Sequence, residues 1–235
     1  MEFMIGLIIE TPPLDVHEQM AADETLCEAL PAQYILRFYN WKGSGATFGY
    51  SQRHAAVESA LSAGGKQHIP AVRRPTGGGI VVHESDLTFS FIFPSPGAYF
   101  EPGKTYTRLH NSINSAYERA GLRFSLLDEK TASYAVNNPV MDCFRKPVNM
   151  DILYNGKKVL GGALRKFGDR MLYQASFQTD DARAKAGFHG EIISKTLGNE
   201  FGLAWHTAGA GEETLEKVRS LARSKYASAD WNERI

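Results

Sequence analysis

The amino-acid sequence contains one segment, rich in arginine and glycine, that could bind an anion. It runs Arg73-Arg74-Pro75-Thr76-Gly77-Gly78-Gly79. Glycines lack a Cβ atom, so their backbone N–H groups can approach a ligand closely. The two arginines add guanidinium groups that pair with phosphate or carboxylate. The same residues could instead form a tight hairpin turn between two strands with a solvated arginine pair, and this segment alone leaves both interpretations open.

A second segment with potential chemistry is a predicted hairpin rich in lysine and glycine. It runs Asp151-Ile152-Leu153-Tyr154-Asn155-Gly156-Lys157-Lys158-Val159-Leu160-Gly161-Gly162-Ala163. Because side chains alternate along a strand, Lys157 and Lys158 should point to opposite faces, and only one could line a pocket. Gly161 and Gly162 would let a ligand or another backbone come close. The alternative is a polar hairpin tip with surface lysines.

Cys143 is the candidate nucleophile. It lies in the polar stretch Met141-Asp142-Cys143-Phe144-Arg145-Lys146, where the neighbouring basic side chains could lower the pKa of its thiol. A free cysteine is more often a small buried hydrophobic residue, and Cys27, on the apolar side of a predicted helix, is interpreted in that way. His83 follows the arginine–glycine segment, so it could face the same pocket or be structural.

The elements that would position these residues are predicted to be a mixture of strands and helices. Strands are expected at 4–9, 34–41, 69–73, 80–83 and 87–93, and helices at 15–30, 55–61, 105–120 and 212–226. Asp15 and Glu18 predict a cap at the start of the first helix. Turn signals at Asn155-Gly156 and Gly168-Asp169 predict a three-stranded antiparallel meander over 150–177. This order favours an α+β fold, with mixed and antiparallel sheets and flanking helices, over a doubly wound fold.

Composition and charge exclude several classes of protein. The 26 basic side chains balance 26 acidic ones, so there is no general field for nucleic acid or for an anionic membrane. Two cysteines cannot form the disulfide framework of a small secreted scaffold. No apolar run approaches the ~18 residues of a membrane span, and the start lacks the features of a signal peptide. We therefore expect a cytoplasmic protein that binds neither nucleic acid nor membrane. The scattered histidines form no metal-binding motif, so no metal is expected.

In combination, these segments resemble the lipoate–protein ligase and octanoyltransferase family. Residues 73–83 are similar to its signature loop and residues 155–163 to its second motif. Phe48-Gly49-Tyr50-Ser51-Gln52 resembles an early strand–turn element, and residues 20–30 resemble the opening helix. The resemblance covers about residues 15–180. It implies the biotin/lipoate protein ligase catalytic-domain fold, with residues 1–235 as a single catalytic domain and no separate C-terminal accessory domain.

The resemblance also implies a site, which is a tunnel for a medium-length acyl chain roofed by the glycine loop. Lys158 would be the motif lysine that reaches the acyl carbonyl or carboxylate, and Lys157 would face away. With Cys143, Lys158 forms the expected catalytic pair. The residues expected to bind substrate are Arg73, Arg74, Thr76, Gly77, Gly78, Gly79, His83, Asp151, Gly161, Gly162 and Ala163.

Two chemistries occur in this family. In the ligase branch, ATP with magnesium converts lipoate to lipoyl-adenylate. In the transferase branch, a cysteine takes the acyl group from a thioester, and no tightly bound cofactor is needed. Cys143-Phe144 and the residues 83–90 resemble the transferase branch more closely. We therefore expect an octanoyl or lipoyl transferase, with an ATP-dependent ligase as the alternative.

The partners that the resemblance implies are proteins. The acceptor would be a lipoyl-acceptor domain of a 2-oxoacid dehydrogenase or a glycine cleavage H-type protein, and an acyl carrier protein is a possible donor. One departure from the family pattern bears on activity. Gln174-Ala175-Ser176 stands where the family usually has His-Gly-Ser or His-Gly-Thr, and Gly162 stands where serine is common. The departure leaves open a third interpretation, a non-catalytic module that binds lipoate or an acyl chain.

Overall fold

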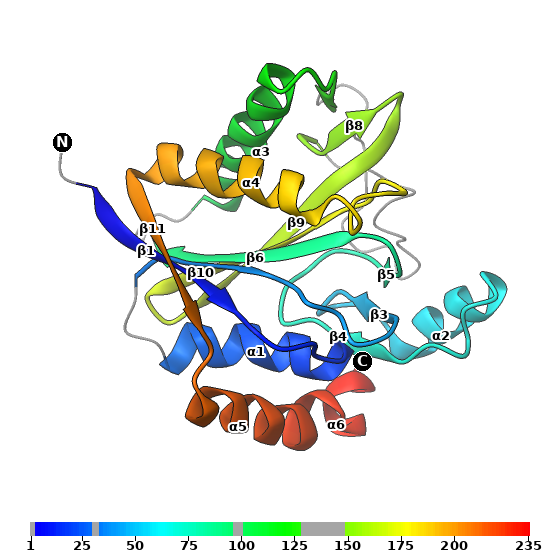
Figure 1. Ribbon diagram of the computed structural model, residues 1–235. Coiled ribbons are helices and arrows are strands. Elements are labelled where there is room, and N and C mark those ends of the chain that lie inside the picture. Colours follow the sequence, from blue (N-terminus) through cyan, green and yellow to red (C-terminus); the bar gives the residue numbers. More distant parts are fainter. Residues whose placement is uncertain (1–2, 30–32, 96–100, 128–148) are drawn as a thin grey trace.

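The computed structural model describes residues 3–29, 33–95, 101–127 and 149–235 (Figure 1). The helices are α1 (Val16–Ala29), α2 (His54–Ala63), α3 (Pro102–Arg119), α4 (Ala186–Phe201), α5 (Glu212–Leu221) and α6 (Ala229–Asn232), with a π-helical turn η2 (Ala222–Tyr226) between the last two. The strands are β1 (Met4–Glu10), β2 (Ile35–Phe38), β3 (Gly45–Phe48), β4 (Ala71–Arg73), β5 (Val81–His83), β6 (Leu87–Pro94), β7 (Ser125–Leu126), β8 (Ile152–Tyr154), β9 (Lys157–Phe167), β10 (Arg170–Phe177) and β11 (Leu203–Gly209).

A large mixed sheet carries the core. In the described residues its strand order is β11-β1-β2-β6-β10-β9-β8-β7. Figure 1 shows α3 and α4 on one face of this sheet and α1 with α5 on the other. The two central strands, β6 and β10, bury nearly every side chain, including Phe89, Phe91, Tyr173 and Phe177. The expected α+β architecture of mixed sheets and flanking helices is therefore confirmed.

A small second sheet, of order β4-β3-β5, holds the arginine–glycine segment. β3 pairs in parallel with β4 and antiparallel with β5, so β4 and β5 do not pair with each other. The interpretation of residues 75–79 as a tight hairpin turn is therefore wrong. The segment is a loop that crosses from one side of β3 to the other, and β3 itself was not among the predicted strands.

The predicted meander is confirmed in β8, β9 and β10, which pair antiparallel in that order. Asn155 and Gly156 both have positive φ, at 50° and 74°, as the two-residue hairpin turn requires. The register of β8 against β9 shifts, because Ile152 pairs with Leu160 whereas Leu153 pairs with Lys158. Val159 is therefore the extra residue of a β-bulge, which the simple alternation pattern did not predict.

The predicted helices are largely confirmed, and two helices of the structure, α4 and the short α6, were missed. Asp15 and Glu18 cap α1 reciprocally, each backbone N–H donating to the other's carboxylate at 3.0 Å. The last predicted helix ends at Leu221 and continues as η2. α4 and β11 were not predicted; β11 pairs in parallel with β1. Within the described residues, no helix combines the length and apolar character needed to cross a membrane.

Candidate functional site

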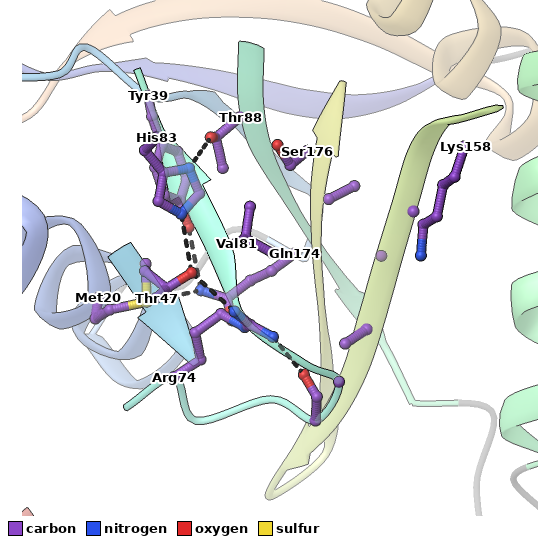
Figure 2. Close-up of a pocket in the computed structure, with 16 residues that line it drawn as sticks. Met20, Tyr39, Thr47, Arg74, Val81, His83, Thr88, Lys158, Gln174 and Ser176 are labelled. Carbon is purple, nitrogen blue, oxygen red and sulfur yellow. Dashed lines mark hydrogen bonds between the residues drawn. The ribbon is translucent and has the colours of Figure 1, made fainter. Parts of the chain in front are cut away.

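A cavity lies beneath the glycine loop, between the small sheet and strands β9 and β10. About 450 Å³ of space around it is not filled by atoms, and this figure includes space open to solvent. Figure 2 shows one wall built from the small sheet and α1, and Lys158 on β9 opposite it. The lining residues are Met20, Tyr39, Thr47, Arg74, Gly77, Gly78, Val81, His83, Thr88, Lys158, Gly161, Gly162, Ala163, Gln174, Ala175 and Ser176.

Lys158 and Lys157 separate as the hairpin pattern predicts. Lys157 is exposed, whereas Lys158 is only 9 % exposed and lines the cavity. The Lys158 ammonium lies 2.7 Å from the carboxylate of Asp151, which is fully buried. Because the bulge places Val159 as an extra residue, both Val159 and Leu160 pack into the core while Lys158 turns to the cavity.

Gly161 is required by the position of Lys158. A Cβ atom at residue 161 would stand 2.1 Å from Cε and 2.3 Å from Nζ of that lysine. The lysine side chain therefore lies flat across the glycine on its way to Asp151. Gly162 is similarly constrained, since its Cβ would stand 2.4 Å from the ring of Tyr173.

Tyr106, on α3, supports this ion pair and was missed in the sequence. Its hydroxyl donates to Oδ1 of Asp151 at 2.5 Å and accepts from the backbone N–H of Gly162 at 3.1 Å. Burial raises the pKa of Tyr106 well above its ordinary value, and the nearby Asp151 charge adds to this, so the phenol stays protonated. Tyr106 precedes the apolar face of α3 by one turn, so in the sequence it is indistinguishable from a packing residue.

Behind Tyr106 lies a neutral histidine. The rings of Tyr106 and His110 stack with centroids 3.9 Å apart, and Nε2 of His110 lies 2.7 Å from the hydroxyl of Tyr173. Burial lowers the pKa of His110 to about 3, and the positive charge of Lys158 contributes to the shift. The ammonium of Lys158 is thus the cation that this side of the site presents.

His83 lines the opposite wall with both ring nitrogens engaged. Nδ1 lies 2.8 Å from Asp86 and Nε2 lies 2.9 Å from the hydroxyl of Thr47, while Trp41 stacks on the ring at 4.4 Å. Burial alone would raise the pKa of Asp86, but the charge of His83 and hydrogen bonds to the carboxylate lower it to about 2. His83 therefore offers the cavity mainly ring carbon.

The hydroxyl groups on this wall are satisfied in the same way. Thr88 and Ser176 both donate to Asp86, at 2.6 Å and 2.7 Å. Because these polar atoms bond to one another, the surface left for a ligand is largely carbon. Such a wall suits an apolar chain.

The two arginines of the signature segment have separate roles. Arg74 lines the cavity and donates to the carbonyls of Gly77 and Gly79 at 2.9 Å and 2.8 Å, so it holds the loop in shape. Arg73 points away from the cavity. Its guanidinium donates to the carbonyls of Tyr50, Gln52, Trp231 and Asn232 at 2.6–3.0 Å. The geometry thus gives Arg73 a structural position rather than one at the cavity.

Gln174 links the glycine loop to the core. Its amide oxygen accepts from the hydroxyl of Thr76 at 2.6 Å, and its amide nitrogen donates to Asp23 at 2.7 Å. Asp23 in turn is paired with buried Arg37 at 2.6 Å. A glutamine side chain has both the acceptor and the donors that these contacts use.

The structure thus brings together most of the predicted site residues. Those lining the cavity are Arg74, Gly77, Gly78, His83, Lys158, Gly161, Gly162 and Ala163. Asp151 and Gly79 adjoin it through Lys158 and Arg74. Arg73 and Thr76 are buried outside the lining. Cys143 lies outside the described residues. Among those residues, no three side chains of His, Cys, Asp or Glu are grouped so that they could hold a metal ion.

Solved structures share this fold. A lipoate protein ligase of T. acidophilum with bound lipoic acid superposes with a TM-score of 0.74 at 20% identity, covering 98% of this chain and 99% of the other. A lipoate-protein ligase A bound with ATP gives a TM-score of 0.72 at 21% identity, with 98% of both chains covered.

Relatives in sequence are named as transferases. The chain is 26% identical to octanoyltransferase LipM of Lysinibacillus sphaericus, over 91% of this chain and 93% of the relative. It is 27% identical to octanoyltransferase LipM of Bacillus subtilis, over 91% and 92%. The lipoyl protein ligase A/B catalytic domain matches residues 15–186, which include every lining residue of the cavity. The chain belongs to the lipoyl protein ligase A/B catalytic domain family.

Proposed function

We propose that this chain is an acyltransferase of protein lipoylation, which moves an octanoyl or lipoyl group through a thioester on Cys143 to a lysine of a lipoyl-acceptor protein. The observation that carries the proposal is the position of Lys158. Its ammonium is buried, held by Asp151, and set at the edge of a cavity whose other wall offers mostly carbon. A cation beside an apolar cavity suits a ligand with a polar carbonyl head and a hydrocarbon tail.

The chemistry proceeds in two acyl transfers. The Cys143 thiolate attacks the carbonyl carbon of the donor thioester, and the tetrahedral intermediate expels the donor thiolate, which is protonated to the free thiol. The acceptor lysine, as the neutral amine, then attacks the thioester on Cys143. The amide bond forms, the Cys143 thiolate leaves, and the amine proton is released to solvent.

In both steps Lys158 would donate hydrogen bonds to the oxyanion that develops on the carbonyl oxygen. A fixed donor is effective here because little reorganisation is needed as the charge appears, and one such donor contributes roughly 10²–10³ in kcat. The name that the LipM relatives carry supports the transferase chemistry.

An ATP-dependent lipoate–protein ligase is the second candidate, and the fold likeness to an ATP-bound ligase favours it. ATP would then be a substrate, and the loop at Gly77–Gly79 would lie against the adenylate phosphate. For the acceptor, we propose a lipoyl domain under either chemistry. A bipartite lipoate protein ligase of Thermoplasma acidophilum, described with its E2 lipoyl domain, has the same fold with a TM-score of 0.71 at 18% identity.

Mass spectrometry of the protein with each donor separates the candidates. Incubation with octanoyl carrier protein and no nucleotide should add one acyl group, and Cys143→Ser should abolish the adduct. Cys27→Ser is the matched control, because Cys27 is buried and its surroundings raise the pKa of its thiol far above the ordinary value. Lipoylation of an acceptor domain only with lipoate and ATP would establish the ligase instead. Ligand binding without transfer from either donor would indicate a non-catalytic binding module.

A further inference from the structure

Two arginines from distant parts of the chain converge on one tyrosine next to the glycine loop. The guanidinium carbon of Arg165, on β9, lies 4.5 Å from the ring centroid of Tyr50, and that of Arg234, after α6, lies 4.4 Å from it. Cation–π contacts of this length are attractive, yet they place two like charges beside the same ring. Trp231 packs against Tyr50 edge-on at 5.8 Å and closes the group on one side.

The two arginines also affect the acidity of the Tyr50 hydroxyl. Burial alone would raise the pKa of Tyr50, but hydrogen bonds from Arg234 and Arg165, with their charges, lower it below its ordinary value. Arg234 also lies near enough to Arg73 that its charge, after burial, helps to lower the pKa of that guanidinium. In the described part of the chain, no carboxylate forms an ion pair with Arg165 or Arg234. By contrast, Arg108 is paired with Glu200 at 2.5 Å.

The group is adjacent to the proposed acyl site. Gly161, Ala163 and Arg165 alternate along β9 and so face the same side of the strand. Gly161 and Ala163 line the cavity, and Arg165 lies about 7 Å farther along the strand than Ala163 at 3.3 Å per residue. The backbone of Tyr50 donates to the carbonyl of Thr76 at 2.9 Å, which fixes this group against the glycine loop.

We propose that Tyr50, Arg165 and Arg234 bind a phosphate group of the acyl donor while its acyl chain lies in the cavity. This proposal rests on the transferase function proposed above and specifies the donor. Two guanidinium forks can each take a different oxygen of a tetrahedral phosphate. The Tyr50 hydroxyl beside the two guanidinium groups has a hydrogen that it can donate to a third oxygen. A bound dianion also relieves the repulsion between the two cations. The phosphate would come from the phosphopantetheine of a thioester donor, or from a nucleotide.

Direct binding tests this without any turnover. Calorimetry measures the Kd of two pairs of probes, 4′-phosphopantetheine with pantetheine and ATP with adenosine. Each pair is measured on the full wild-type chain, on the double variant Arg165→Gln/Arg234→Gln and on the control Arg123→Gln. Arg123 is exposed and follows α3, near the middle of the sequence. The wild type and the control should bind one phosphorylated probe about tenfold more tightly than its unphosphorylated partner. The double variant should show a ratio near one. The phosphorylated probe that is preferred identifies the source of the phosphate.

Equal binding of both members of each pair by the wild type would overturn the proposal, as would an unchanged preference in the double variant. If the double variant fails to fold, Tyr50→Phe replaces it, and this variant should lose part of the preference. Transfer from octanoyl-phosphopantetheine and from octanoyl-N-acetylcysteamine is then compared. Absence of turnover from both thioesters would count against the proposed transferase function, whereas the binding ratios would still decide the phosphate site.

Discussion

The aliphatic chain of Lys158 lies against the backbone of Gly161 so closely that a methyl group at position 161 would stand 2.1 Å from Cε of the lysine. No ordinary carbon–carbon contact is this short, so either the strand or the lysine must move if a side chain is added. This contact explains the glycine in physical terms. The glycine leaves space for the side chain of Lys158. It is not needed for a turn, because residue 161 lies inside β9.

Gly161→Ala should therefore reduce transfer much more than it reduces stability. Moving Lys158 away from the acyl carbonyl would remove one oxyanion donor, so kcat should fall by roughly 10²-fold. Steady-state transfer kinetics and thermal unfolding check both halves. Gly187→Ala is the matched control, since nothing lies within 4 Å of a Cβ at that position. Activity that survives Gly161→Ala at the wild-type level would contradict the assigned position of Lys158.

Tyr106→Phe should show whether Tyr106 positions Asp151 for catalysis or only stabilises the fold. The change removes a donor to Asp151 and leaves the Gly162 N–H without its hydroxyl acceptor, which costs on the order of 1–2 kcal/mol of unfolding free energy. Because Asp151 would no longer be held on both sides, we expect kcat to fall about tenfold, with a smaller change in the KM of the donor. Tyr34→Phe is the control, because Tyr34 packs by its ring on Phe91 and Phe201. A pure stability loss with unchanged kcat would refute the positioning role.

The sequence predicted most residues that line the candidate site, but it did not predict Tyr106, which helps to position them. The cavity-lining glycines, Arg74, His83 and Lys158 were all identified, because the chemistry of each residue type is visible in the motif. Tyr106 was not, since a tyrosine near an apolar helix face has the pattern of a core residue until its partners Asp151 and Gly162 are located in space.

In the fold, too, features set by neighbouring residues were predicted, whereas pairings between distant strands were not. The hairpin at Asn155-Gly156 and the α1 cap depend on neighbours within a few residues, and both were predicted. The crossing of residues 75–79 over β3 depends on which strands pair, and the parallel pairing of β11 with β1 joins opposite ends of the chain. Local patterns carry little information on such pairings.

Arg73 should stabilise the packing of the C-terminal helix α6 against β4. Its side chain donates to the carbonyls of Trp231 and Asn232, and its own carbonyl accepts from the Trp231 indole at 2.9 Å. Arg73→Met should leave several buried carbonyls without donors and lower the unfolding free energy by about 3 kcal/mol or more. Denaturant unfolding measures this loss. Arg53→Met, at an exposed position, should have little effect. An equally stable Arg73→Met protein with a raised KM for the donor would instead support the role in substrate binding expected from the sequence.

Stability should fall as the pH drops from 6.5 towards 3, and His110 is one cause. The pKa of His110 is about 3 in the folded chain against 6.5 for an ordinary histidine, so in this window the unfolded chain binds a proton that the folded chain does not. The contribution of neutral His110 to the unfolding free energy is therefore complete above pH 6.5. It is lost on acidification, by up to about 1.4 kcal/mol for each pH unit in the window. Urea unfolding at a series of pH values, for the wild type and His110→Asn, checks this. The variant should have a flatter pH dependence between 6.5 and 3, and an unchanged slope would show that His110 is not responsible.

Gln174→His tests the departure from the family pattern at the third strand of the meander. Gln174 accepts from Thr76 and donates to both Asp23 and the hydroxyl of Tyr39, at 2.7 Å and 3.1 Å. A neutral histidine has one donor and one acceptor, so at least one of these buried contacts must be lost. We expect a loss of about 1–3 kcal/mol in unfolding free energy and a looser glycine loop, with a raised KM for the donor. Gln174→Glu, which keeps the shape but places a second carboxylate beside Asp23, should be more damaging still. A histidine variant with improved transfer and unchanged stability would mean that the glutamine impairs catalysis instead of holding the loop.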